Sequence, residues 1–115
     1  MNKADFNLLC QQVAVSAEHL QFLLDEIRTM IPTATVWAFG SRVDGTHRPA
    51  SDLDLAVHCD KETAFKDLPR LNEHLIESDL PFKVQLLDFD RLPKNMQGNI
   101  KIGYVVMNQP QEETR

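Results

Sequence analysis

Residues 35–58 read TVWAFGSRVDGTHRPASDLDLAVH, and the two ends of this stretch decide the fold. Residues 35–39 are β-branched, aromatic and apolar on both parities, which predicts a central strand buried on both faces. Gly40 ends that run. Apolar and polar residues alternate over 52–58, which predicts a second strand with one apolar and one polar face. Residues 42–51 contain glycine, proline and polar side chains, so we expect a loop there with room for one helical turn.

The rest of the chain predicts helices around this pair of strands. Apolar residues at helical spacing indicate a helix over 17–31, with Ser16 placed to cap it, and another over 62–77, where Pro69 can kink or split it. The other expected elements are a short helix over 5–14, a strand over 82–86, a short helix over 91–102, a strand over 104–107 and a frayed tail over 108–115. This order lacks a regular alternation of strands and helices. We therefore expect an α/β protein of the α+β kind, a small mixed sheet flanked by helices.

Length, composition and charge narrow the class of protein. A chain of 115 residues, 43% of them apolar, is expected to form one domain over 1–115, with peripheral segments of about 15 and about 8 residues at its two ends. The net charge of −5 and the lack of a Lys/Arg cluster argue against nucleic-acid binding. Cys10 and Cys59 have no paired spacing and are expected to be reduced thiols. Without a membrane-length apolar run or a signal peptide, the chain is expected to be cytoplasmic.

Gly40 and Ser41 stand where the first strand stops, which suits a phosphate group. Backbone N–H groups point outward at such a turn, glycine allows close approach, and a serine hydroxyl adds a donor. Asp52 and Asp54 are two residues apart on the second strand, so they project from one face at a separation of about 6–7 Å. Mg²⁺ is usually held by one or two carboxylates together with substrate phosphates. The pattern therefore predicts a site for magnesium and a nucleoside triphosphate.

Other phosphate and metal motifs do not fit these residues. Gly40 and Gly45 have the glycine spacing of a P-loop, but Thr46 and His47 occupy the places of its lysine and hydroxyl residue. An EF-hand loop beginning at Asp52 would place apolar residues where a ligand and the turn glycine belong. By itself, an Asp-x-Asp is more often the solvated polar face of an edge strand than a metal site. A Gly-Ser by itself is usually an ordinary turn. Gly-Ser followed after ten residues by Asp-x-Asp is far less common by chance.

A family resemblance adds to this pattern. It is carried by residues 37–42, Gly45, and residues 51–55, 78–84 and 86–88. The segments WAFGSR and SDLDL, with their Gly-Ser and Asp-x-Asp ten residues apart, resemble the signature of minimal nucleotidyltransferases in the DNA polymerase β-like superfamily. The resemblance covers roughly residues 20–106 and includes features of a short bacterial subgroup.

The resemblance implies a fold, a reaction and a partner. The fold is the small palm sheet of the polymerase β-like nucleotidyltransferases. Asp52 and Asp54 would be the catalytic, magnesium-binding carboxylates, and Gly40, Ser41 and Arg42 would hold the triphosphate. An acceptor hydroxyl attacks the α-phosphorus of ATP and pyrophosphate leaves, a reaction that depends on positioning and charge neutralisation. The hydroxyl belongs to a small acceptor or to a helical partner protein of the HEPN or substrate-binding type. In toxin–antitoxin pairs of this kind, AMP is added to a tyrosine of the helical toxin.

The chain departs from the family pattern at the third carboxylate. Gln85 occupies that position, and on the predicted third strand it shares the polar face with Lys83. An amide cannot act as a general base, and loss of such a base costs about 10²–10⁴ in rate. Asp88 would replace it only if the strand ends or bulges before that residue. The alternative function is therefore a catalytically weakened antitoxin or regulatory subunit that binds nucleotide and its helical partner.

Four other side chains near these motifs have a functional and a structural interpretation. Arg42 either contacts phosphate or ties the loop to a nearby carboxylate. His47 and His58 are more typical of packing or surface residues than of proton donors at the site, and Trp37 is typical of a core residue.

Overall fold

The computed structural model describes residues 1–110, and the tail predicted to fray lies outside them from residue 111 onward. The helices are α1 (Lys3–Val13), α2 (Ala17–Met30), α3 (Ser41–Asp44), α4 (Lys61–Ile76) and α5 (Lys94–Ile102). The strands are β1 (Thr35–Phe39), β2 (Leu53–His58), β3 (Val84–Asp88) and β4 (Val105–Asn108), and the short 3₁₀ helix η1 (Phe89–Arg91) follows β3.

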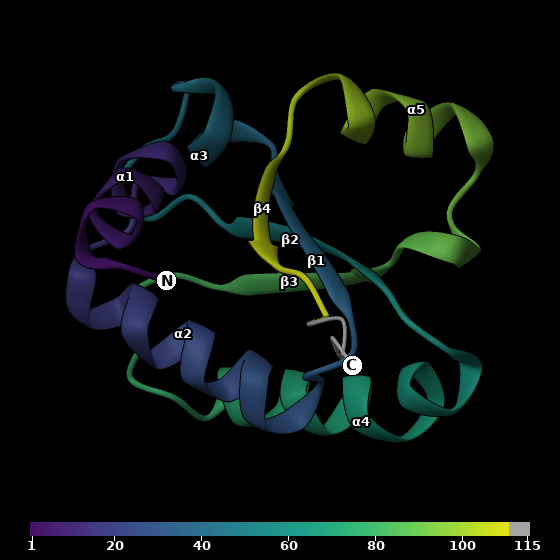
Figure 1. Ribbon diagram of the computed structural model, residues 1–115. Helices are drawn as coiled ribbons and strands as arrows, with labels where there is room; N and C mark the ends of the chain where they lie inside the picture. The colour runs from purple at the N-terminus through teal and green to yellow at the C-terminus, as the bar shows by residue number, and fades with distance from the viewer. Residues whose placement is uncertain (111–115) are drawn as a thin grey trace.

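The four strands form one mixed sheet in the order β3-β2-β1-β4. β1 pairs antiparallel with β2 and β4, whereas β2 and β3 are parallel and are connected through α4. The helices α2 and α4 lie side by side below the sheet, and α5 lies on the opposite side (Figure 1). The predicted fold class, a small mixed sheet flanked by helices, is confirmed, and β1 is internal as expected.

Two polar side chains fix where helices begin. Asn2 Oδ1 accepts from the backbone N–H of Asp5 at 2.8 Å and so caps α1. Asp60 Oδ1 accepts in the same way from Thr63 at 2.9 Å and caps α4. Pro69 does not split α4, which continues to Ile76. Leucines before and after the proline are buried against the sheet, and this packing offsets the one backbone hydrogen bond that proline removes.

The sheet has a large core on one face and a small one on the other. The large core packs the sheet against α1, α2 and α4, and its sheet residues are Val36, Ala38, Leu53, Leu55, Val57 and Val84. The small core lies under α5 and contains Ala56, Phe89 and Ile100. Trp37 and Phe39 pack against it but stay half-buried. The prediction that β1 is buried on both faces is therefore wrong for one face, because α5 covers only part of it.

Several strand boundaries differ from the sequence prediction by one or two residues, and two of them have an identifiable tertiary contact. The third strand begins at Val84 and not at residue 82, because the Phe82 ring packs under the Arg42 guanidinium, 4.3 Å from its centroid. Asn108, predicted as the start of a frayed tail, belongs to β4. Its Nδ2 donates to the Ala34 carbonyl at 2.8 Å, which ties the end of β4 to the start of β1.

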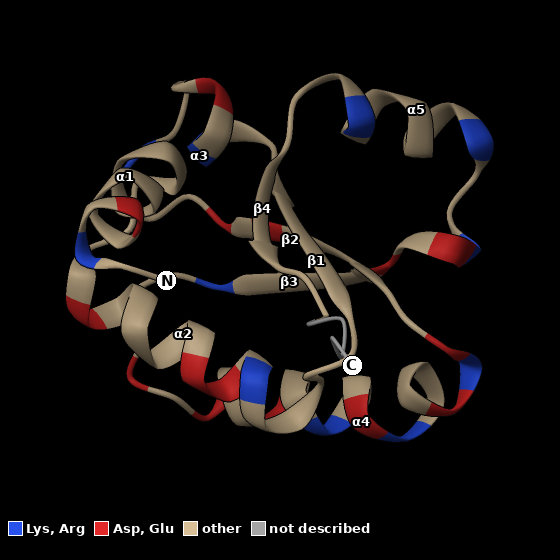
Figure 2. Cartoon of the chain, in the orientation of Figure 1, with Lys and Arg blue, Asp and Glu red and all other residues tan. Residues whose placement is uncertain are grey.

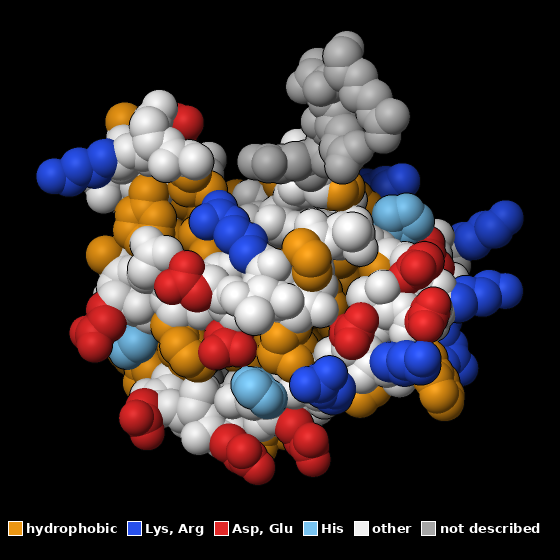
Figure 3. Space-filling view, turned by 60° about the horizontal axis from the view of Figure 1, so that its bottom comes forward, with side chains coloured by type: hydrophobic (Ala, Val, Ile, Leu, Met, Phe, Trp, Pro, Cys, Tyr) orange, Lys and Arg blue, Asp and Glu red, His pale blue; other side chains and the backbone are white. Residues whose placement is uncertain are grey.

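Three features of the described residues concern membranes, surface charge and cysteine pairing. Within residues 1–110 no helix is both long and apolar enough to cross a membrane. The face formed by α2 and α4 carries acidic and basic side chains interspersed (Figure 3). Cys10 and Cys59 are free thiols, as expected.

Candidate active site

Asp52 and Asp54 lie at the start of β2, on the face of the sheet opposite to α2 and α4. Leu53, between them, is fully buried in the large core, so the alternating carboxylates project from the other face. The register pairs Asp54 with Phe39 at the end of β1 and with Gln85 in β3. The acidic start of β2 therefore lies beside the turn that follows β1 (Figure 2).

Gly40 brings that turn directly against the carboxylate pair. Its backbone has φ 84° and ψ −156°, a region that is essentially restricted to glycine. A Cβ added at this position would lie 2.5 Å from Oδ2 of Asp54. The backbone conformation therefore requires glycine, and a Cβ here would also displace the Asp54 carboxylate. The structure brings the two sequence motifs, ten residues apart in the chain, into one site.

The turn continues into α3, the single helical turn for which the sequence left room. The N–H groups of Val43 and Asp44 both donate to the Gly40 carbonyl at 3.0 Å. The N–H groups of Ser41 and Arg42 come first in the helical turn, where no carbonyl of the turn itself can accept from them. Backbone donors of this kind, next to a glycine, are suited to bind phosphate oxygens.

The electrostatics of the pair favour a bound cation. Burial, and after it the neighbouring Asp52 carboxylate, raise the pKa of Asp54 above its ordinary value. Both effects oppose a second negative charge at this point of the sheet. Two carboxylates with phosphate oxygens are a donor set that suits Mg²⁺. Within residues 1–110, no group of three or more His, Cys, Asp and Glu side chains forms a metal site.

Gln85 lies directly beside Asp54, because the parallel register of β2 and β3 pairs these two residues. The prediction from strand parity that Gln85 borders the carboxylate pair is therefore confirmed, so the neighbour of Asp54 on β3 is an amide. Asp88 pairs instead with Val57, which is fully buried in the large core, so it belongs to the opposite face. It lines a cavity with Cys59 and α4. Since β3 runs through Asp88 without a bulge toward β2, the condition for Asp88 to replace Gln85 is not met.

Arg42 is buried, with 5% of its surface exposed, and its guanidinium holds loops together. Nε donates to the Ser51 carbonyl at 3.0 Å, Nη1 to that of Ala14 at 2.6 Å and Nη2 to that of Pro49 at 2.9 Å. The guanidinium also lies over the Phe82 ring. Of the two interpretations of Arg42, these contacts support the structural one, in which it ties loops together, although its partners are backbone carbonyls and not a carboxylate. Because its guanidinium nitrogens already donate to these carbonyls, we do not assign the Arg42 side chain to phosphate binding.

The two histidines lie apart from the carboxylate pair. His58 Nδ1 is 2.8 Å from Oδ2 of Asp90, and its ring stacks on Trp37. Four residues of extended strand separate it from Asp54, which corresponds to about 13 Å. His47 lies in the loop after α3, and its buried Nδ1 has no hydrogen-bond partner within the described residues. His58 is therefore too far from Asp54 to exchange a proton with it, and His47 lines a different cavity, with Arg42 and Phe82.

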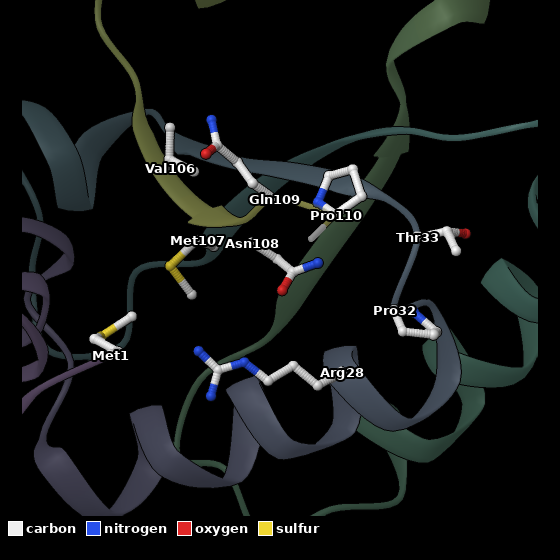
Figure 4. Close-up of a pocket in the computed structure, with 9 residues that line it drawn as sticks. All are labelled: Met1, Arg28, Pro32, Thr33, Val106, Met107, Asn108, Gln109 and Pro110. Carbon is white, nitrogen blue, oxygen red and sulfur yellow. The ribbon is translucent and has the colours of Figure 1, made fainter. Parts of the chain in front are cut away.

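Two cavities differ in their relation to this site. A cavity of about 700 Å³ between the end of α2 and β4 contains none of the predicted site residues (Figure 4). A cavity of about 440 Å³ lies between Gly40 and α5 and includes Met96, Asn99 and Ile102. No pattern in the sequence predicted that α5 borders the site. The signal that it does contain is that α5 has two apolar residues, Met96 and Ile102, besides the buried Ile100.

Comparisons with known proteins agree with this geometry. Residues 25–112 match the family described as polymerase beta, nucleotidyltransferase. The chain is 37% identical over 101 residues to a protein of Haemophilus influenzae named "Probable protein adenylyltransferase MntA", a similarity that covers 88% of this chain and 89% of that protein.

Solved structures share the fold at lower sequence identity. One is a crystal structure of a toxin–antitoxin with AMP-PNP, with a TM-score of 0.56 and 21% identity over 80% of this chain and 74% of that chain. Another is a mutant of the toxin–antitoxin MntA-HpeT, with a TM-score of 0.56, 18% identity and the same coverage of 80% and 74%. The family match extends over most of the chain and includes the Gly40 turn and the carboxylate pair. This chain belongs to the polymerase β-type nucleotidyltransferase family.

Proposed function

We propose that this nucleotidyltransferase moves AMP from magnesium-bound ATP to a hydroxyl group of a helical partner protein. One observation carries the proposal: the Asp54 carboxylate lies against Gly40, so that metal-binding and phosphate-binding groups meet. A triphosphate whose outer phosphates lie on the Gly40–Ser41 turn would have its α-phosphate within reach of the carboxylates.

Each group of the site has a distinct role in this proposal. The backbone N–H groups of Ser41 and its neighbour, with the serine hydroxyl, hold the β- and γ-phosphates. Asp52 and Asp54 would hold Mg²⁺, which when bound would neutralise charge on the phosphates. The acceptor oxygen forms a bond to the α-phosphorus, the bond to the bridging oxygen breaks, pyrophosphate leaves, and the hydroxyl proton passes to solvent, because the neighbour of Asp54 on β3 is an amide. Arg42 keeps the loop between the two motifs in place.

The acceptor is proposed from the relatives. The Haemophilus relative is named as a protein adenylyltransferase, and the structural neighbours are toxin–antitoxin proteins. A protein hydroxyl on a helical partner of the HEPN or substrate-binding type is therefore our first candidate. A small acceptor molecule is the second, and it would also need a partner surface beside this short chain.

A second function is favoured by Gln85. Gln85, an amide, lies beside Asp54, and within residues 1–110 no third carboxylate joins the pair to take the proton of the acceptor hydroxyl. The chain would then bind nucleotide and its partner, and act as an antitoxin or regulatory subunit by contact, with slow or no transfer.

The test of the leading proposal uses ATP labelled at the α-phosphate. The purified chain and Mg²⁺ are incubated with candidate helical proteins encoded by neighbouring genes, and label on each candidate is measured. We expect transfer by the native chain and none by Asp52→Asn. Transfer that persists in Asp52→Asn contradicts the assigned mechanism.

The same assay separates the two functions. Gln85→Asp restores a third carboxylate, and if the native site is weakened, transfer should rise by about 10²-fold or more. Equal rates of the native chain and Gln85→Asp would rule out the weakened-subunit function. Gln85→Glu is a useful comparison because it restores the charge on a longer side chain.

A further inference from the structure

The cavity between Gly40 and α5 has walls of two kinds. Phe39, at the end of β1, and Met96 and Ile102, on α5, supply apolar surface, and Asn99 supplies an amide. Its volume of about 440 Å³ falls within the usual range of small-molecule sites. Ile102 is 86% exposed and Met96 37%, so apolar surface at the rim of the cavity is open to solvent.

The charge of this cavity excludes phosphate. Among the described residues that line it there is no lysine or arginine, and Asp44 is the one ionisable residue. Thr46 donates to Oδ1 of Asp44 from its hydroxyl at 2.6 Å and from its backbone at 2.9 Å. These hydrogen bonds lower the pKa of Asp44 and keep its carboxylate ionised. A negative, largely apolar cavity repels a phosphate group but accepts a neutral, flat group with hydrogen-bonding edges.

The cavity is also a fixed neighbour of the phosphate-binding turn. Gly40 belongs both to the cavity wall and to the contact with Asp54. The opposite wall is anchored because Ile100 of α5 is buried with Ala56 of β2 and Phe89 in the small core. A ligand that spans Gly40 would therefore meet phosphate donors and carboxylates on one side and this apolar cavity on the other.

We propose that the cavity between Gly40 and α5 binds the nucleoside part of the triphosphate, with Asn99 as the residue that contacts the edge of the base. This inference rests on the proposed function, since it assigns the neutral end of the nucleotide whose phosphates bind at the Gly40–Ser41 turn. Burial of the base between Phe39, Met96 and Ile102 would cover the apolar rim.

Gly103 offers a way to fill the cavity without straining the backbone. It lines the cavity, its φ is −147°, and an added Cβ would meet no atom within 4 Å. Gly103→Phe therefore places a ring where the nucleoside would lie. Gly98→Phe is the matched control, because Gly98 lies in α5, has equally open space, and does not line the cavity.

The experiment compares two ligands by calorimetry: ATP with Mg²⁺, and inorganic tripolyphosphate with Mg²⁺, which has phosphates but no nucleoside. We expect Gly103→Phe to weaken ATP binding by about tenfold or more, as loss of about 60 Å² of apolar burial implies. It should leave tripolyphosphate binding within about twofold of the native value, as a change that touches no phosphate contact costs little. Gly98→Phe should bind both ligands as the native chain does.

Asn99→Leu tests the amide with a side chain of similar size. Loss of one hydrogen bond to the base should weaken ATP binding by about three- to tenfold, with tripolyphosphate unchanged. Melting curves of all three variants check that each is folded before its binding is measured.

The outcomes distinguish this inference from the proposed function. If the native chain binds neither ATP nor tripolyphosphate, both proposals fail. If it binds both and Gly103→Phe binds ATP as tightly as the native chain, the nucleoside site is wrong while the phosphate site stands. A Gly103→Phe variant that binds ATP normally but transfers no AMP would assign the cavity to the acceptor, which also overturns this inference.

Discussion

Gly40 is the residue on which the site depends most directly. Its conformation, φ 84° and ψ −156°, is costly for any residue with a Cβ, and its Cα faces the Asp54 carboxylate. Gly45 also has a positive φ, 86°, but an added Cβ there meets nothing within 4 Å. Substitution of either glycine would strain the backbone, but only substitution of Gly40 would also disturb the site.

We expect Gly40→Ala to lower the free energy of unfolding by about 1–3 kcal/mol from strain alone and to abolish nucleotide binding. Gly45→Ala should cost about 1–2 kcal/mol but leave binding intact, because only the strain is shared. Denaturant unfolding and calorimetry with Mg²⁺ and ATP measure the two effects. Equal binding by both variants would contradict the role of the Gly40–Asp54 contact.

At the scale of elements, the start of α4 depends on one cap. The hydroxyl of Thr63, and then its backbone N–H, donate to the Asp60 carboxylate and lower the pKa of that group from its ordinary value. A depressed pKa in the folded state means that the cap stabilises the fold above the pKa of the unfolded chain, about 3.9. That stabilisation is lost as the pH falls through the lower, folded pKa.

The Asp60→Ala variant should therefore melt at a lower temperature than the native chain at pH 7, and the difference should shrink as the pH falls below the unfolded pKa of about 3.9. Asp60→Asn is the control, since asparagine also caps helices but carries no charge. Melting curves across pH test this, and a difference that stays constant down to low pH would exclude the charged cap as its cause.

At the scale of the whole molecule, ligand binding and stability are linked through the carboxylate pair. Asp54 is opposed by burial and by Asp52, so its ionised form destabilises the empty protein. Stability lost at a functional site is commonly recovered when the ligand binds. Ligand binding at the carboxylate pair should therefore raise the melting temperature.

Mg²⁺ and ATP together should stabilise the native chain by about 2.7 kcal/mol at an ATP concentration one hundred times the dissociation constant. Chelation of the metal should reverse this. The Asp54→Asn variant should be at least as stable as the native chain without ligand and should gain nothing from Mg²⁺ and ATP. Equal stabilisation of that variant would show that the nucleotide binds elsewhere.

Much of the fold could be predicted from local patterns. The alternation over residues 52–58 located β2, and apolar spacing located α2 and α4 to within one residue at each end. Boundaries that depend on tertiary contacts were missed. Phe82 has the parity of a strand residue but packs under Arg42, and Asn108 looks like a polar tail but bonds to Ala34.

The sequence by itself determined the chemistry at the ends of β1 and β2. Glycine, serine and two aspartates at fixed spacing need only strand parity to place both carboxylates on one face, and parity also put Gln85 beside them. Only the tertiary structure decided three contacts. Asp54 lies against Gly40, Arg42 donates its hydrogen bonds to loop carbonyls, and α5 forms a cavity beside the turn. The physical reason is range: parity acts within a strand and its register, whereas these contacts join segments that the chain brings together only when its cores pack.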